Sequence, residues 1–151
     1  MSRYQISIEN NYTSNSIEFI ENQLLEFNFS QIGSYEYKPL VIFLRDSRSK
    51  ISSQENIVGG FYGFIGLGWL NVSTLWVAET LRGQGYGQAI LTTAEQEAIQ
   101  QKCDYAYVFT YSFQAPNFYQ KLGYEIVGTQ RKVGFKNGEW IDVVIMQYII
   151  D

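Results

Sequence analysis

The sequence predicts an α/β fold formed by one domain that spans residues 1–151. Three observations support this fold class. Apolar, strand-like runs alternate with amphipathic helical patterns, a glycine-rich turn joins one run to the longest helical pattern, and an Asn-Gly pair near the C-terminus predicts a hairpin. A chain of 151 residues with 46% hydrophobic composition can bury one core, so no second domain is needed.

The N-terminal third is expected to contain one strand and one helix. Apolar and polar residues alternate over residues 3–9, as in a half-buried strand. Residues 16–27 follow a helical pattern, and Thr13, Ser14 and Ser16 are candidate N-caps because their side-chain oxygens can accept from the first turn. The polar, aromatic segment that follows shows no periodicity, so we expect a loop there.

The rest of the chain alternates strands with helices. The expected strands cover residues 40–44, 57–65, 69–77, 105–111, 125–135 and 140–149, with a solvated turn region at residues 46–56. The expected helices cover residues 86–101 and 116–122, and Asn137-Gly138 joins the last two strands as a hairpin turn.

The glycine-rich turn has the sequence Arg82-Gly83-Gln84-Gly85-Tyr86-Gly87 and lies between a strand and the long helix. Such a turn exposes successive backbone N–H groups at the positive end of a helix dipole, which suits an anion such as phosphate. No Gly-Lys-Ser/Thr follows, and the glycines do not have the dinucleotide-binding spacing. A glycine-rich helix cap that binds nothing is the alternative.

A second segment, residues 112–124, predicts a helix of about two turns. Pro116 suits its first turn and Gly123 its C-terminal end. Read without other information, the segment could also be an ordinary capped helix whose aromatic residues belong to the core.

The two segments together resemble the GNAT superfamily of acyl-CoA N-acyltransferases. Arg82-x-x-Gly85-x-Gly87 is similar to its pyrophosphate loop. Six residues match its later motif: Ala115, Phe118, Tyr119, Lys121, Gly123 and Tyr124. The resemblance implies the GNAT fold, with a mixed sheet of six to seven strands flanked by helices. It also implies that the fourth and fifth strands, ending at Val77 and Tyr111, splay apart to admit the cofactor.

The resemblance also implies the binding residues for the co-substrate acetyl-CoA. The backbone groups of Leu75, Trp76 and Val77 would bind pantetheine and polarise the thioester carbonyl. The pyrophosphate would lie on the N–H groups of Gly83, Gln84, Gly85, Tyr86 and Gly87, beside Arg82. Ser112 and Asn117 are further cofactor-binding candidates, and Ser112 stands where many members carry Asn.

Tyr119 matches the general acid of the family. A phenol with a pKa near 10 can return a proton to a leaving thiolate whose conjugate acid has a pKa near 8.5. A purely structural Tyr119 is the alternative.

The general base is not evident. Some members carry Glu at the position of Asn71, and the amide cannot take that proton. Glu36 and Glu79 are expected to be solvated carboxylates, so water-mediated proton loss through Asn71, Ser73 or a tyrosine is preferred. No Cys or Ser is placed as a covalent nucleophile, which favours direct transfer.

Composition narrows the function classes. The chain has one cysteine, which excludes an intramolecular disulfide, and Cys103 is expected to be a structural, buried thiol. Because the chain has no histidine, a zinc site or a histidine triad is not expected. The net charge of −4 argues against nucleic acid as a partner. No membrane partner and no signal sequence are expected, so a cytoplasmic location is predicted. A homodimer is compatible with the sequence.

The leading functional hypothesis is an N-acetyltransferase that moves an acetyl group from acetyl-CoA to a primary amine of a small molecule or peptide. A non-catalytic acyl-CoA-binding regulatory domain is the alternative, and a scaffold that uses exposed aromatic residues is a third. Four aromatic residues could line an acceptor pocket: Tyr35, Tyr37, Tyr62 and Trp69.

Overall fold

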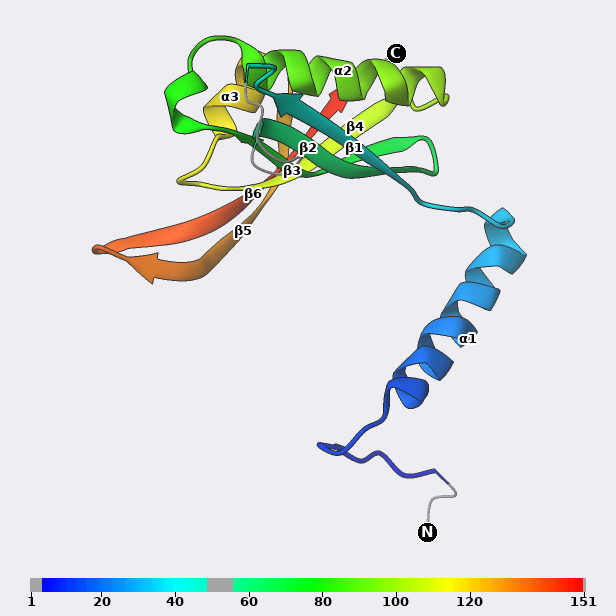
Figure 1. Ribbon diagram of the computed structural model, residues 1–151. Helices are drawn as coiled ribbons and strands as arrows, with labels where there is room; N and C mark the ends of the chain where they lie inside the picture. The colour runs from blue at the N-terminus through cyan, green and yellow to red at the C-terminus, as the bar shows by residue number, and fades with distance from the viewer. Residues whose placement is uncertain (1–3, 49–55, 151) are drawn as a thin grey trace. The chain divides into compact units, whose positions relative to one another are not determined.

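The computed structural model describes residues 4–48 and 56–150 (Figure 1), and the chain falls into two compact units, Met1–Tyr35 and Glu36–Asp151. The first unit contains helix α1 (Ser14–Ile32). Thr13 is its N-cap, because its side-chain oxygen accepts a 3.3 Å hydrogen bond from the Ser16 N–H. The helix begins close to its predicted start. Its predicted end is residue 27, and the observed helix continues for five more residues, to Ile32.

The predicted strand at residues 3–9 is wrong for its described part. Residues 4–9 have no regular secondary structure. Alternation supplies one apolar face, but a strand also needs a neighbour to complete its ladder of hydrogen bonds, and alternation alone does not supply one. Residue 3 lies outside the described part.

The second unit is built on a mixed, open sheet of six strands. Their order across the sheet is β1-β2-β3-β4-β6-β5, and β3 and β4 are the one parallel pair in this order. The strands are β1 (Lys38–Arg45), β2 (Ile57–Gly66), β3 (Trp69–Val77), β4 (Tyr105–Tyr111), β5 (Glu125–Lys136) and β6 (Glu139–Ile149). This sheet confirms the predicted fold class. Of the turn region predicted at residues 46–56, residues 49–55 lie outside the described part.

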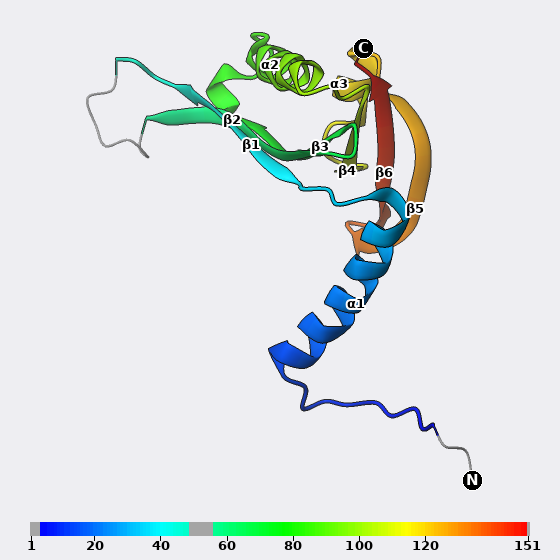
Figure 2. The same cartoon turned by 90° about the vertical axis from the view of Figure 1, so that its right-hand side faces the viewer.

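The main helices of this unit lie on one face of the sheet. Helices α2 (Tyr86–Gln100) and α3 (Pro116–Lys121) both cover this face (Figures 1 and 2), and a short 3-10 helix, η1 (Glu79–Leu81), follows β3. The core lies between α2 and the sheet. Its buried apolar strand residues are Phe61, Ile65, Leu70, Val72, Ala106, Val108, Val144 and Met146, and α2 contributes Ile90, Leu91, Ala94 and Ala98.

β3 and β4 separate halfway along their length. Their pairing runs from Trp69 opposite Tyr105 to Val72 opposite Val108 and goes no further. β3 stays paired with β2 as far as Val77, and β4 stays paired with β6 as far as Tyr111, so each strand is held on its outer side only. The predicted splay between these strands is confirmed.

A β-bulge marks the start of the splay. The register between β2 and β3 shifts so that Tyr62 opposes Thr74 while Gly63 opposes Val72, which leaves Ser73 as the extra residue. A bulge bends its strand and increases the local twist, and this turns β3 away from β4. The backbones approach closely here, so that a Cβ at Gly63 would overlap the Asn71 carbonyl oxygen.

Cys103 lies in the core, as predicted, and burial raises the pKa of its thiol. Within residues 4–48 and 56–150, no group of three or more Cys, Asp or Glu side chains is arranged to hold a metal ion. No helix in the described part of the chain is long and apolar enough to cross a membrane.

Candidate active site

The glycine turn leads into the N-terminus of α2. Gly83 and Gly85 have φ angles of 74° and 88°, in the left-handed region that favours glycine, and a Cβ at either would meet nothing within 4 Å. Gly85 is the N-cap of α2 and provides no side-chain cap. The first N–H groups of the helix therefore have no capping side chain, as an anion site requires.

Two side chains of the turn bond to the chain that precedes it. Arg82 donates from Nε to the Val77 carbonyl oxygen at 3.1 Å, and Gln84 donates from Nε2 to the Thr80 carbonyl oxygen at 2.9 Å. The first bond ties the turn to the end of β3. The remaining guanidinium N–H groups of Arg82, an exposed side chain, are available to an anion.

The turn, the end of β3 and α3 meet at Gly87. A Cβ at Gly87 would lie 3.5 Å from the Phe118 ring and 3.9 Å from a Val77 methyl group. The structure thus brings the turn, which the first motif predicted, next to the helix that the second motif predicted. Leu75 is half-buried against the core, whereas the Trp76 side chain is exposed.

Tyr119 is held tightly in α3. Its side chain is 5% exposed, and its ring makes edge contacts with Phe118 at 5.1 Å and with Tyr124 at 5.4 Å between centroids. Burial raises the pKa of Tyr119 to about 12. The phenol therefore keeps its proton throughout the physiological range, as a proton donor must.

A partly buried hydrogen bond connects α2 with the chain after α3. Tyr124 donates from its hydroxyl to Glu95 Oε1 at 2.9 Å. Desolvation raises the pKa of the Glu95 carboxyl, and the bond from Tyr124 opposes that rise. Because Tyr124 also contacts the Tyr119 ring, this bond links the helix that begins at the glycine turn to the expected general acid.

The two remaining predicted cofactor residues lie at the end of β4 and in α3. The Ser112 hydroxyl accepts from the Asp142 N–H at 3.1 Å, and the Ser112 N–H donates to the Asp142 carbonyl at 2.9 Å, so Ser112 anchors the chain after β4 to β6. Asn117 lies in the first turn of α3 with an exposed side chain.

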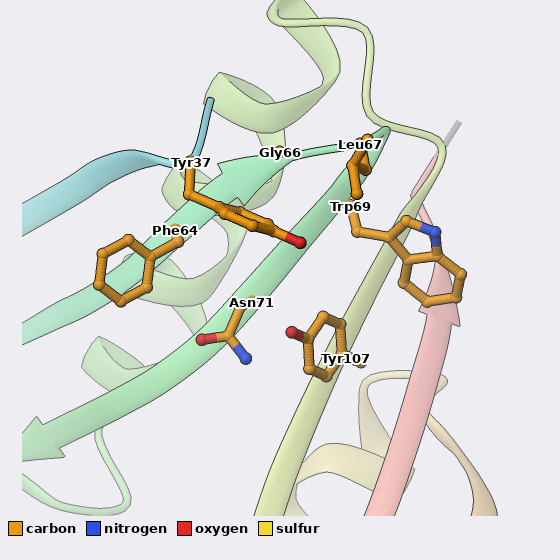
Figure 3. Close-up of a pocket in the computed structure, with 7 residues that line it drawn as sticks. All are labelled: Tyr37, Phe64, Gly66, Leu67, Trp69, Asn71 and Tyr107. Carbon is orange, nitrogen blue, oxygen red and sulfur yellow. The ribbon is translucent and has the colours of Figure 1, made fainter. Parts of the chain in front are cut away.

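A pocket lies on the sheet face opposite α2 (Figure 3), and it is built from cross-strand rows. Phe64, Asn71 and Tyr107 oppose one another on β2, β3 and β4, and Trp69 on the next row opposes Gly66 and Tyr105. The cavity has a volume of about 360 Å³. Seven residues line it: Tyr37, Phe64, Gly66, Leu67, Trp69, Asn71 and Tyr107.

Gly66 makes room for one wall of this pocket. A Cβ at Gly66 would lie 2.5 Å from the Tyr37 ring, so only glycine lets that ring lie over β2 at this point. Trp69 is fixed from the other side, stacked on Tyr105 at 4.7 Å and in edge contact with Tyr107 at 5.8 Å. The aromatic walls are thus oriented by their neighbours.

The candidates for proton removal fall into two groups. Asn71 lies in the pocket, and Ser73 donates a hydrogen bond to its side-chain oxygen, so these two polar groups act as a unit beside the splay. Glu36 and Glu79 have exposed side chains and do not line the pocket.

Of the four aromatic residues that sequence reasoning offered for an acceptor pocket, Tyr37 and Trp69 line it. Tyr62 contacts Phe64 on the same face at 5.0 Å, whereas Tyr35 belongs to the first unit and contacts Phe29. Sequence reasoning missed Phe64 and Tyr107. The alternation of aromatic residues with small or apolar ones in β4 indicates that the aromatic side chains share one face of the sheet. Only the strand register shows which of them lie next to Phe64 and Asn71.

Comparison with solved structures identifies this architecture as the GNAT fold. The chain superposes on an acetyltransferase from Bacillus cereus ATCC 14579 with a TM-score of 0.77 and 24% identity, over 95% of this chain and 97% of that one.

Sequence comparison then establishes the family. The acetyltransferase (GNAT) domain family matches residues 44–126. Acetyltransferase Atu2258 of Agrobacterium fabrum (strain C58) is 31% identical over 73% of this chain and 76% of its own length. Blasticidin-S acetyltransferase of Streptomyces morookaense is 33% identical over 62% of this chain and 68% of its own length. The chain belongs to the GNAT acetyltransferase family and is an acyltransferase.

Proposed function

We propose that this acetyltransferase takes the acetyl group from acetyl-CoA and transfers it directly to a primary amine of a small molecule or peptide. The observation that carries the proposal is the splay between β3 and β4, with the uncapped helix N-terminus at one end and the pocket on the far face. The small-molecule acceptor is favoured because one relative is a blasticidin-S acetyltransferase.

The residues at the turn fit a pyrophosphate. Gly83 and Gly85 leave open the space that side chains would fill, and the N–H groups from Gly83 to Gly87 lie at the positive end of α2. Arg82 adds a positive charge. The inner side of β3 from Ser73 to Val77, which β4 does not pair, supplies backbone groups for the amides of a pantetheine arm, with Leu75, Trp76 and Val77 nearest the turn. The Val77 carbonyl already accepts from Arg82, so the N–H is the free group of that residue.

Acetyl-CoA, when bound, supplies an acetyl group activated as a thioester. Backbone N–H donors of β3 would stabilise negative charge on the carbonyl oxygen, an effect worth about 3 kcal/mol per donor. Tyr119 Oη would hold the proton that the leaving sulfur requires. The amine would lose its own proton to water held by Asn71 and Ser73 or by a pocket tyrosine. The pocket proposed for the acceptor and the Tyr119 side chain lie on opposite faces of the sheet, because Tyr119 belongs to the core on the side of α2.

The decisive experiment is a pair of measurements on the purified protein. Binding of acetyl-CoA should raise the melting temperature, since a ligand selective for the native state stabilises it by about 2.7 kcal/mol at one hundred times its Kd. An amine library with detection of released thiol should then give turnover. No shift at millimolar acetyl-CoA, with calorimetry also silent, would remove the donor assignment. Binding without turnover would favour the non-catalytic alternative. A single functional domain, a cytoplasmic location and a homodimer stay predictions.

A further inference from the structure

We infer that the pocket on the face opposite α2 binds a single aromatic ring of the acceptor, so that the preferred acceptor is a primary amine on a short arm from such a ring and has no acidic group. This inference rests on the proposed function and names the acceptor class of that same site.

The position of the pocket relates it to the reaction. Asn71 and Tyr107 oppose each other one residue before the last β3–β4 pair, Val72 with Val108, so the pocket adjoins the point where the strands separate. The glycine turn lies at the other end of β3, after Val77. A donor that enters from the turn and an acceptor held in the pocket would therefore meet at the splay.

The walls of the pocket are aromatic. Phe64, Trp69 and Tyr107 come from three adjacent strands, and the Tyr37 ring lies over Gly66. Aromatic rings attract another ring through offset or edge contacts worth about 0.5–1.5 kcal/mol beyond the area buried. The contacts that already fix Trp69 reduce the conformational entropy lost on binding.

The absence of charge defines what the pocket rejects. None of the described residues that line it carries a carboxylate, an ammonium or a guanidinium group. An acceptor with a carboxylate or phosphate would lose hydration there without gaining a counter-charge, and a diamine would find no carboxylate for its second ammonium. A neutral body next to the reacting amine fits this lining.

Polar groups mark where the amine would lie. In Figure 3 the Tyr107 hydroxyl points toward the Asn71 amide, and the Tyr37 hydroxyl extends toward the same space. Ser73 orients the Asn71 side chain through their hydrogen bond. The volume of about 360 Å³ is near the lower end of the range for small-molecule sites, roughly 300–1,000 Å³, which suits one ring and a short arm.

The test compares three matched amines as acceptors with acetyl-CoA. 2-Phenylethylamine carries the ring, phenylalanine adds a carboxylate beside the same amine, and 1,5-diaminopentane replaces the ring by a second ammonium. We expect kcat/KM for 2-phenylethylamine to exceed the other two values at least ten-fold. Equal or better turnover of phenylalanine or diaminopentane would overturn the inference.

A matched pair of variants locates the effect. Trp69→Leu removes one wall of the pocket, whereas Trp140→Leu removes an exposed indole on the β5–β6 hairpin, outside the lining. We expect Trp69→Leu to raise KM for 2-phenylethylamine about ten-fold while KM for acetyl-CoA stays constant, and Trp140→Leu to change neither. An unchanged KM in Trp69→Leu would contradict the assignment of the ring to this pocket.

A binding measurement keeps the inference separate from the proposed function. Tryptophan fluorescence of the wild type, with Trp69→Leu as the reference, should change saturably with 2-phenylethylamine and not with diaminopentane. If acetyl-CoA fails to bind but this change is seen, the proposed function fails and the pocket assignment stands. If acetyl-CoA binds and the fluorescence of Trp69 does not respond, the pocket assignment fails and the donor assignment stands.

Discussion

The two ends of β3 serve the proposed site with different kinds of atoms. Beyond Val77 the chain offers backbone N–H groups at glycines with positive φ, and a side chain there would be strained. At Trp69 and Asn71 it offers side chains that project from a regular sheet. The backbone end therefore tolerates few residue types, whereas the side-chain end can change its chemistry by substitution without altering the fold. This difference suits a common donor and a variable acceptor.

The largest effect is expected from Tyr119→Phe, at the donor end. The ring and its contacts with Phe118 and Tyr124 are kept, so affinity for acetyl-CoA should stay nearly constant, while kcat falls about 10²-fold, in the usual range for a general acid. Steady-state kinetics with the best amine of the library would measure both. The decrease in kcat should be smaller for acyl donors whose leaving thiol is more acidic. If the variant turned over at the wild-type rate, Tyr119 would be a packing residue and not the general acid.

The pH profile of the wild-type enzyme tests the same role. Because the pKa of Tyr119 is raised to about 12, its proton is retained up to strongly alkaline pH. The kcat should therefore rise as the acceptor amine loses its proton and show no falling limb below about pH 10. A falling limb between pH 7 and 9 in a protein still folded there would point to a different acid.

The second effect separates cofactor binding from backbone strain. Gly85→Ala and Gly138→Ala both place an alanine at positive φ, 88° and 83°, and both Cβ positions face open space. Each should lose about 1–2 kcal/mol of stability from the left-handed backbone. Only Gly85→Ala should weaken acetyl-CoA binding, by roughly ten-fold or more, as measured by calorimetry. If the two variants bound acetyl-CoA with equal affinity, the turn would be a helix cap and not a cofactor site.

A smaller effect is expected at the acceptor end. Gly66→Ala places a Cβ 2.5 Å from the Tyr37 ring, which must shift, so KM for the acceptor should rise several-fold while KM for acetyl-CoA is unchanged. Gly134→Ala is the control, because its Cβ would lie 3.6 Å from Ile141, an ordinary contact. If both variants behaved alike, Tyr37 would not be part of the acceptor site.

The smallest effect concerns Glu95, the residue of α2 that accepts the hydrogen bond from Tyr124. Its pKa is raised on folding from an ordinary value of 4.5, so the native state holds its proton more tightly than the unfolded state. The bound proton therefore contributes its whole free energy of stabilisation at pH values below the ordinary pKa of Glu95. This contribution is lost as the pH rises through the raised pKa of the folded state. Glu95→Gln keeps an oxygen acceptor for Tyr124 and should abolish that loss. Urea unfolding of both proteins at pH 4 to 7 would show whether the difference varies with pH in this direction.

The sequence predicted the glycine turn and the short helix better than the row of residues that lines the pocket, for a physical reason. Glycines at fixed spacing between a strand and a helix are visible in one dimension, and so is the short helix framed by Pro116 and Gly123. The row of Phe64, Asn71 and Tyr107 comes from three strands, and it depends on the register in which β2, β3 and β4 pair. The strand predicted at residues 3–9 failed for a related reason, since alternation does not specify a pairing partner.

The splay also has a consequence for the behaviour of the protein in solution. From Ser73 to Val77, β3 has hydrogen-bonding groups on its inner side that β4 does not pair. The Arg82 side chain bonds to the Val77 carbonyl at one end, and none of the five residues is itself charged or proline. Unpaired edges of this kind attract strands from other chains unless charges, prolines or a covering element block them. We expect the ligand-free protein to self-associate through this segment on storage, and a molecule that fills the gap to keep it monodisperse. The opening that admits a substrate would then also be the weakest point of the sheet against aggregation.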